Sequence, residues 1–372
     1  MHGPLLLSFA TFGAGFVIRP IGGVVIGAYA DRRGRKAAMT LTILMMALGT
    51  ALIGLSPTYA QIGLAAPLLI VAGRLIQGFS AGGEVGASTI FLMESATSDT
   101  RGYLVSWQLA SQGASALAGA LCGVFLTHTL SPAALEGWGW RVPFLLGLLI
   151  GPVGMYIRSN LKETHHAIPR ASGLPPSRTP YDVRGIVLGT LLMIGSTSSM
   201  YVVVFYLPSW LTNVAHLSGA AAFLPSGLAG LILTVASPLC GKLTDRLGRR
   251  KPILYVTGVA GVLVLYPVFA LMLRAPVMLT ILPGVAVIIG LRVLANPAGF
   301  LLLLEGFPRD MRGRSLGIIY SLGVSLFGGF APFVVTWLIS VTKSPYAPVW
   351  YMAVCGLVSL IALPMFDERV TD

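Results

Sequence analysis

The chain of 372 residues is 55% hydrophobic and only 10% charged, and its formal net charge is +12. This composition excludes a water-soluble globular domain and predicts an integral membrane protein. The charge does not indicate nucleic-acid binding, because the basic residues gather in every second connection between apolar segments, as the positive-inside rule requires.

Apolar stretches follow one another along the whole chain. Eleven of them are long enough to cross about 30 Å of hydrocarbon as helices that rise about 1.5 Å per residue. The alternating pattern of barrel strands is absent, so we expect an all-α membrane fold. The predicted spans are 5–30, 37–56, 64–92, 103–129, 141–158, 183–211, 217–240, 252–273, 277–304, 315–341 and 346–366.

Two short motifs in the connections occur twice. The stretch 27–36 returns as 241–250, so that Asp31 and Asp245 lie 214 residues apart. In a second pattern, an acid precedes an Arg-Gly pair by seven residues. It begins at Glu94 and recurs at Glu305, 211 residues later. The nearly equal offsets indicate two homologous halves.

The charged residues of these motifs are candidates for a gate. A carrier needs ion pairs that can break, because alternating access is a rocking of one half against the other. Anchoring by positive charge alone would not require Asp and Gly at a fixed spacing twice. The candidate gate residues are Asp31, Arg32, Arg35, Glu94, Arg101, Asp245, Arg246, Arg249, Glu305 and Arg312. The positive-inside rule predicts that they and the C-terminus are cytoplasmic. We expect the membrane to be a bacterial-type plasma (inner) membrane, which the chain crosses many times.

A polar interval, 159–182, is rich in Pro, Ser, Arg and His and separates five predicted spans from six. We expect it to be a cytoplasmic linker between an N-terminal transmembrane half, 1–158, and a C-terminal half, 183–372. The second half has two spans before its Asp245 motif and the first half has one before Asp31. We therefore expect eleven of twelve helices to be present and the first to be missing; a natural protein of eleven helices is the alternative.

Four strongly ionic side chains fall well inside the predicted spans: Arg19, Arg74, Glu84 and Arg292. An intramembrane charge is unfavourable enough to mark a functional candidate. Arg19 lies twelve residues, or about 18 Å, from Asp31, near the bilayer midplane. It is a candidate for substrate binding or coupling; its alternative is a pairing with an acid of the missing helix or with a carbonyl.

Arg292 precedes Asn296 by one helical turn, and a planar guanidinium suits bidentate binding of a carboxylate. The alternative for this pair is a hydrogen bond between helices. Gln108 and Gln112 give the span 103–129 a polar face, and they serve equally well as ligands or as contacts between helices. Tyr201 is expected among packing and interfacial aromatic residues, and the alternative is that its ring lines the cavity.

In the span 64–92 a polar stripe recurs at helical spacing and is expected to face a central cavity. Its members are Arg74, Gln77, Ala81, Glu84 and Ser88. Glu84 is the only carboxylate well inside the predicted spans, which makes it the candidate for proton loading. Desolvation disfavours its charged form and a nearby cation favours it. Its alternative is a fixed ion pair that braces the helix.

The motif at 27–36 resembles the signature of the major facilitator superfamily. Further stretches resemble its metabolite:proton symporter family, whose members carry citrate, 2-oxoglutarate, shikimate, proline or betaine. These stretches are 73–84, 138–144, 161–164 and 327–332. The resemblance implies a fold of two pseudo-symmetric six-helix halves, and it ties Arg74 to proton coupling.

Within that family, 9–31 and 106–112 are most similar to citrate and tricarballylate carriers, whereas 133–141 is as similar to 2-oxoglutarate carriers. We therefore expect proton-coupled symport of a small organic carboxylate, citrate or a related di- or tricarboxylate. The alternatives are 2-oxoglutarate, shikimate or a zwitterion as substrate, or a transport-inactive truncation.

The expected partners are this organic acid, protons and the lipid bilayer, and the protein is expected to be a monomer that binds no nucleic acid. We expect no enzyme activity, metal or cofactor. The adjacent His165 and His166 lack a third ligand, no phosphate-binding loop occurs, and nothing resembles a nucleophile with its base.

Overall fold

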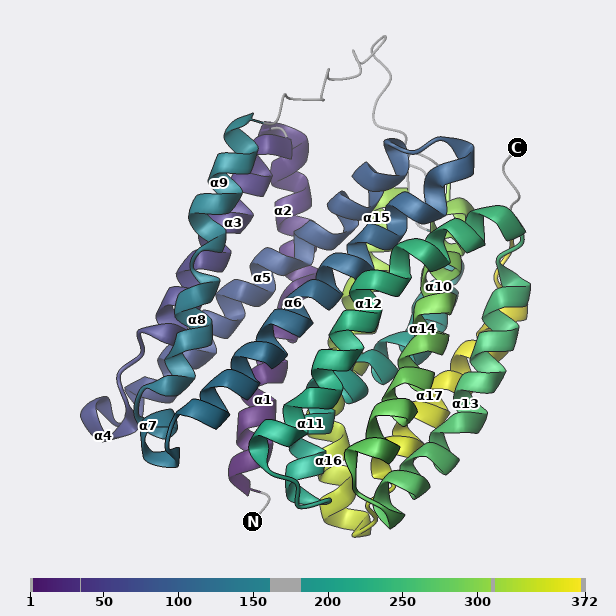
Figure 1. Cartoon of the computed structure of the whole chain (residues 1–372). Helices are drawn as coiled ribbons and strands as arrows, with labels where there is room; N and C mark the ends of the chain where they lie inside the picture. Colours follow the sequence, from purple (N-terminus) through teal and green to yellow (C-terminus); the bar gives the residue numbers. More distant parts are fainter. Residues whose placement is uncertain (1–2, 34, 161–181, 309–311, 369–372) are drawn as a thin grey trace.

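The computed structural model describes residues 3–33, 35–160, 182–308 and 312–368, and over these residues the chain forms helices and no strands (Figure 1). The expected all-α membrane fold is confirmed. The first half contains α1 (Gly3–Val17), α2 (Arg19–Arg33), α3 (Arg35–Gly54), α4 (Tyr59–Ile62), α5 (Ala65–Glu94), α6 (Arg101–Thr129), α7 (Pro132–Gly137), α8 (Val142–Gly147) and α9 (Ile150–Asn160). The second contains α10 (Val183–Met200), η3 (Tyr201–Tyr206), α11 (Leu207–Asn213), α12 (Gly219–Leu247), α13 (Lys251–Arg274), α14 (Met278–Gly306), α15 (Arg312–Gly323), η4 (Val324–Gly329), α16 (Ala331–Thr342) and α17 (Ala347–Ala362).

Ten stretches of the described residues are long and apolar enough to cross a membrane, and they match ten of the predicted spans. The remaining predicted span, 141–158, forms two short helices, α8 and α9, instead of one. Pro152 explains the break, because it has no N–H to donate to the carbonyl of Leu148.

The first span is also broken, between α1 and α2, two residues before Pro20. Pro20 cannot donate to the carbonyl of Phe16. Ser325 Oγ, from the second half, donates to that carbonyl instead at 2.6 Å. A carbonyl left unpaired in hydrocarbon is strongly unfavourable, so this contact fixes the position of the break.

The span 183–213 has the same arrangement. Its π-helical segment η3 precedes Pro208, which frees the carbonyl of Val204. Ser226 Oγ of α12 donates to this carbonyl at 2.7 Å. The α1–α2 break lies near the middle of its span, whereas η3 continues into α11 without a gap and lies past the middle of its own span.

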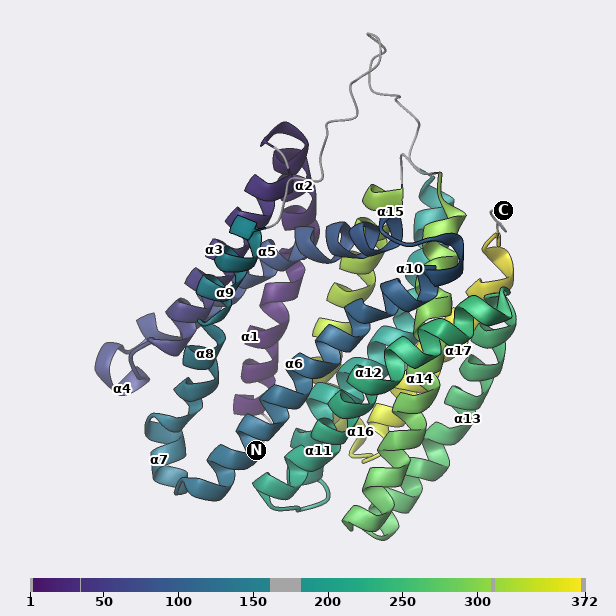
Figure 2. The ribbon, with the colours of Figure 1, turned by 45° about the horizontal axis from the view of Figure 1, so that its top comes forward.

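The two halves meet along α6 and α12, which lie side by side in both ribbon views (Figures 1 and 2). A Cβ atom built on Gly113 would lie 2.8 Å from the carbonyl oxygen of Gly230, and one on Gly230 would lie 2.8 Å from that of Gly113. Further along, a Cβ on Gly241 would lie 2.6 Å from Ser106 Oγ. These glycines allow the two backbones to approach closely.

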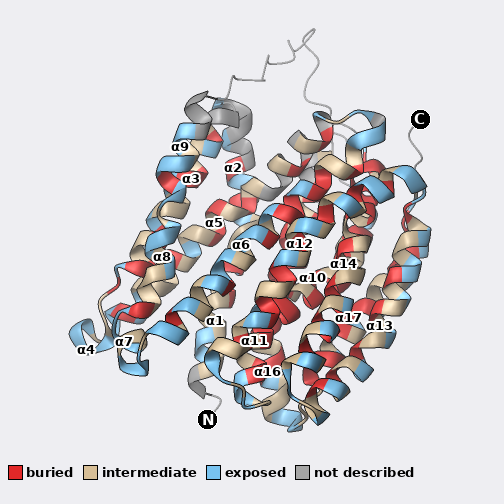
Figure 3. Cartoon of the chain, in the orientation of Figure 1, coloured by how far each residue is buried: buried red, intermediate tan, exposed pale blue. Residues whose placement is uncertain are grey.

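Buried residues lie on the facing sides of the helices, most densely in the second half, and exposed residues lie on the outer sides (Figure 3). Many of the exposed side chains are large and apolar, such as Leu279 at 85% and Val256 at 70% relative exposure. An apolar outer surface suits contact with lipid rather than with water.

Most of the predicted linker, with His165 and His166, lies outside the described residues. The division into two halves at that linker and the missing first helix stay predictions.

Close glycine contacts also join α5 to α1, and they give a test of packing. A Cβ on Gly78 would overlap the carbonyl oxygen of Gly15, whereas a Cβ on Gly290 would meet nothing within 4 Å. We expect Gly78→Ala to lower the free energy of unfolding by about 1–3 kcal/mol through overpacking. Gly290→Ala, the matched control within a helix, should leave stability unchanged or raise it by up to about 1 kcal/mol. Thermal unfolding of both purified variants measures this; equal melting temperatures would contradict the packing argument.

Candidate functional site

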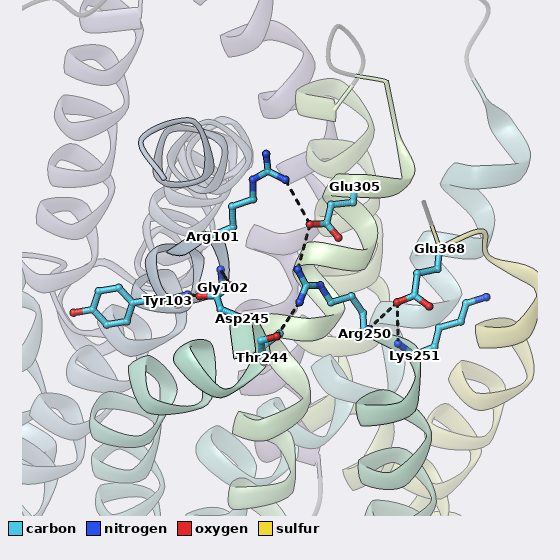
Figure 4. Close-up of polar contacts among 9 residues, drawn as sticks. All are labelled: Arg101, Gly102, Tyr103, Thr244, Asp245, Arg250, Lys251, Glu305 and Glu368. Carbon is cyan, nitrogen blue, oxygen red and sulfur yellow. Dashed lines mark hydrogen bonds and ion pairs between the residues drawn. The ribbon is translucent and has the colours of Figure 1, made fainter. Parts of the chain in front are cut away.

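A polar contact closes one end of the bundle across the two halves (Figure 4). Asp245, near the end of α12, accepts hydrogen bonds from the backbone N–H groups of Gly102 at 2.7 Å and Tyr103 at 2.9 Å. These N–H groups belong to the first turn of α6, where no carbonyl of the helix itself can accept them. The carboxylate also lies at the positive end of the helix dipole. Asp245 of the second half therefore caps a helix of the first half.

Glu305 of α14 joins the same region. Its Oε1 lies 4.0 Å from Arg101 Nη1 and 3.5 Å from Arg250 Nη2. Arg250 Nη1 donates to the carbonyl of Thr244 at 2.9 Å. Glu368 accepts from the backbone N–H of Arg250 at 2.7 Å. We call the contacts of Asp245, Arg101, Glu305 and Arg250 the gate contacts.

The predicted gate residues separate into three groups. Asp245, Arg101 and Glu305 meet in the gate contacts. Arg246 and Arg249 have exposed side chains at the same end, and Arg312 Nε donates to the carbonyl of Phe307 at 2.9 Å. The side chains of Asp31, Arg32, Arg35 and Glu94 lie outside the described residues.

Arg250 was not selected from the sequence. Arg250 is the last residue of the repeated motif. The one sequence signal for it is that the corresponding residue of the first copy, Lys36, is also basic.

A large cavity of about 1150 Å³ lies between the halves. It reaches the end opposite the gate contacts, because Thr212 and Asn213 at the end of α11 and Phe223 at the start of α12 line it. Its charged lining residues are Arg19 and Glu84. Other polar residues in its wall are Ser88, Gln108, Ser111, Gln112, Ser115, Tyr201, Ser209, Ser226 and Tyr320.

Arg19 enters this cavity from the break between α1 and α2. Its guanidinium carbon lies 4.0 Å from the centroid of the Phe16 ring, so the ring face supports the positive charge. Its Nε is buried without a hydrogen-bond partner among the described residues. The proline break thus places a cation at mid-height of the bundle, in the wall of the cavity.

The predicted stripe on α5 faces the cavity only in part. Ala81, Glu84 and Ser88 line it, but Arg74 does not. Arg74 Nη1 donates to Gln77 at 3.3 Å, and its guanidinium lies 5.6 Å from the ring centroid of Phe12. Ten residues of helix separate Arg74 from Glu84, a rise of about 15 Å, so the two do not form a close pair.

A second, small cavity of about 110 Å³ lies beside the large one. Arg292 and Asn296 of α14 line it, as the sequence spacing suggested. Gln108, Gln112, Tyr201 and Tyr320 line both cavities. Tyr201 is therefore a lining residue as well as a packing residue. Tyr320 was missed, because nothing in its sequence context distinguishes it from a packing aromatic.

The described residues contain no group of three or more His, Cys, Asp or Glu side chains placed to hold a metal ion. Chemically, the site offers guanidinium groups, amides, hydroxyls and one carboxylate around enclosed space. Such a site suits reversible binding of a polar solute.

Comparison with known proteins also indicates a membrane transporter. Residues 3–332 match the family model described as Major Facilitator Superfamily. The citrate-proton symporter of Klebsiella pneumoniae is 36% identical, over 95% of this chain and 81% of its own length. That of Salmonella typhi is also 36% identical, over 99% and 85%. A putative proline/betaine transporter of Staphylococcus aureus (strain COL) is 32% identical, over 96% and 78%. These relatives are transporters, not enzymes.

Solved structures show the same fold. A D-xylose-proton symporter superimposes with a TM-score of 0.76 at 18% identity, over 98% of this chain and 88% of its own. An inward-open xylose transporter from E. coli gives a TM-score of 0.74 at 18% identity, over 99% and 87%.

The gate contacts predict the effect of neutralising Asp245. Asp245→Asn removes the charge from the α6 cap and should favour opening of this end by about 1 kcal/mol, which is about a fivefold change in the equilibrium constant. The reporter is Ser106→Cys, in a variant without the three native cysteines, because Ser106 is fully buried next to Gly241. Its labelling rate with a water-soluble maleimide should rise about fivefold. Arg246→Gln, an exposed neutralisation on the same helix, is the control; equal rates in both variants would contradict the prediction.

Proposed function

This chain belongs to the Major Facilitator Superfamily, and we propose that it is a proton-coupled symporter of a small organic carboxylate. Citrate or a related di- or tricarboxylate is the first candidate. The observation that carries the proposal is the pair of mid-height arginines, Arg19 and Arg292, in the walls of the two cavities between and beside the halves. The citrate-proton symporters at 36% identity support it.

The excess of positive charge in the walls of the two cavities supports an anionic substrate. Over the part of the chain that the structure describes, the two cavities together are lined by two arginines and by one carboxylate, Glu84. A cation held in a low-dielectric site attracts an anion strongly, and a guanidinium binds a carboxylate with two parallel hydrogen bonds. Gln108, Gln112 and Tyr320 add neutral hydrogen-bonding groups for the hydroxyl and carboxyl oxygens of such an acid.

Proton coupling is assigned to Glu84. Among the described residues it is the only Asp or Glu in the walls of the two cavities, and we assign it the proton that enters the large cavity. Arg19 lines the same cavity. A carboxylate substrate that binds the arginine changes the field at Glu84, and this linkage lets substrate and proton load together.

The gate contacts are assigned to the cytoplasmic side, because the basic connections lie at that end. The C-terminus then is cytoplasmic, and the large cavity opens outward, in a bacterial inner membrane. Residues 1–158 and 183–372 act as the two rocking halves, joined by the linker 159–182, and the monomer is the working unit.

A zwitterionic substrate is the second candidate, supported by the proline/betaine transporter relatives. It would need one carboxylate site and one site for a cationic nitrogen. The excess of arginine in the cavity walls favours the carboxylate.

Transport is tested directly. The purified full chain in proteoliposomes should accumulate radiolabelled citrate when the outside is more acidic than the inside, and a protonophore should abolish the accumulation. Proline and betaine, tested in parallel, should not compete. Competition by these zwitterions but not by carboxylic acids would reverse the choice of substrate, and no uptake of any of them would reject the proposal.

Glu84→Gln separates coupling from binding. The neutral variant should keep citrate exchange at equal pH on both sides, since exchange moves no net proton, and should lose accumulation driven by a pH gradient. Glu136→Gln, which neutralises an exposed carboxylate on α7, is the control and should retain both. Full uphill uptake by Glu84→Gln would leave Glu84 with a bracing role only.

A further inference from the structure

The two mid-height arginines lie in different cavities and come from different halves. Arg19, at the start of α2, lines the large cavity. Arg292, in the middle of α14, lines the small one. The cavities adjoin, because four residues line both, namely Gln108, Gln112, Tyr201 and Tyr320.

The junction between the cavities is polar and is made by both halves. Gln112 of α6 donates from Nε2 to the hydroxyl of Tyr320 of α15 at 3.3 Å. At this length the hydrogen bond is weak. Both side chains therefore keep hydrogen-bonding capacity for a solute that crosses between the cavities.

The small cavity offers a carboxylate one cationic partner. Its volume of about 110 Å³ is about a tenth of that of the large cavity. Its wall contains Arg292, Asn296, Thr257 and Ser359, and no Asp or Glu among the described residues. Arg292 Nε is buried without a hydrogen-bond partner among the described residues.

Arg292 lies close to Gly261 of α13. A Cβ atom on Gly261 would lie only 3.3 Å from Nη2. The absence of a side chain at Gly261 therefore leaves room for the guanidinium. This cation, with the amide of Asn296 one turn along, can bind a single anionic group.

Resting on the proposed carboxylate symport, we propose that the substrate spans both cavities. One carboxylate lies in the small cavity against Arg292 and Asn296. The rest of the molecule passes the Gln112–Tyr320 junction, and a second carboxylate lies near Arg19 in the large cavity. The site thus selects acids with at least two separated carboxylates over monocarboxylates, and its substrate bridges the two halves.

The test compares acids of different charge on protein variants. Affinities of glutarate and butyrate are measured for the full chain in nanodiscs, by competition with labelled citrate. In the wild type, glutarate should bind on the order of ten- to a hundredfold more tightly than butyrate, because each charged hydrogen-bonded contact contributes about 1.5–3 kcal/mol. Arg292→Gln and Arg19→Gln should each remove that advantage of glutarate.

Butyrate supplies the internal control. A monocarboxylate can use either arginine, so each single variant should change its affinity by only about twofold, the statistical factor for losing one of two sites. The double variant should lose butyrate binding. Arg274→Gln, which removes an exposed arginine at the end of α13, should change neither acid. Asn296→Ala should reduce the glutarate advantage by a smaller factor, and it replaces Arg292→Gln if that variant does not fold.

Two results would overturn the inference. Equal losses for glutarate and butyrate in Arg292→Gln would mean that Arg292 does not hold a separate second carboxylate. An unchanged glutarate affinity in Arg292→Gln or Asn296→Ala would give the small cavity a structural role only. Failure of the proposed function looks different, because then no carboxylic acid would bind to the wild type at all.

Discussion

Within hydrocarbon, each backbone carbonyl and each charge needs a partner inside the protein, because no water is present to supply one. In this chain, candidate site residues lie where a side chain of another helix bonds to a carbonyl that a proline has left free. Pro20 leaves the carbonyl of Phe16 without its helical donor, and Ser325 Oγ donates to this carbonyl instead. Arg19 lies at the resulting break between α1 and α2. Tyr201 lies in the π-helical η3, whose carbonyl at Val204, freed by Pro208, accepts from Ser226. The same constraint that limits the fold to helices therefore also decides where the helices can be irregular and carry polar groups.

The sequence repeat includes the candidate gate residues but not the arginines of the cavities. Asp31 and Asp245, or Glu94 and Glu305, occupy repeated positions. In contrast, Arg292 lies 211 residues after Ala81, and Arg19 lies 214 residues before Leu233. The proposed transport gives a reason for this difference. Rocking would need comparable closing contacts from each half, whereas an asymmetric solute would need different groups on its two sides.

The sequence was sufficient to predict the features that depend on a single helix. Hydropathy located the spans, and charge spacing located Glu84 and the two arginines. The sequence did not show which neighbouring helix each side chain contacts. Arg74 and Glu84 share a helical stripe, but ten residues of rise and the neighbouring Gln77 and Phe12 place Arg74 outside the cavity. Tyr320 and the pairing of Arg101 with Glu305 depend on contacts between residues about two hundred positions apart, which no local period encodes.

The gate contacts also show how the closed end can open without leaving Glu305 unpaired. Among the described gate contacts, two cross between the halves, the Asp245 cap and the Arg101–Glu305 pair. A cap of this kind contributes about 1–2 kcal/mol and a partly exposed ion pair about 0–1 kcal/mol. Complete reversal of a two-state population takes about 5.5 kcal/mol, which is more than these two interactions contribute together. When the halves separate, Glu305 keeps Arg250, which lies in its own half and is held by Thr244 and Glu368. Among the described gate contacts, Glu305 therefore keeps a partner when its pair with Arg101 breaks, whereas Asp245 loses the two N–H groups from which it accepts. A buried carboxylate without a partner is strongly unfavourable, and Arg250 prevents this for Glu305.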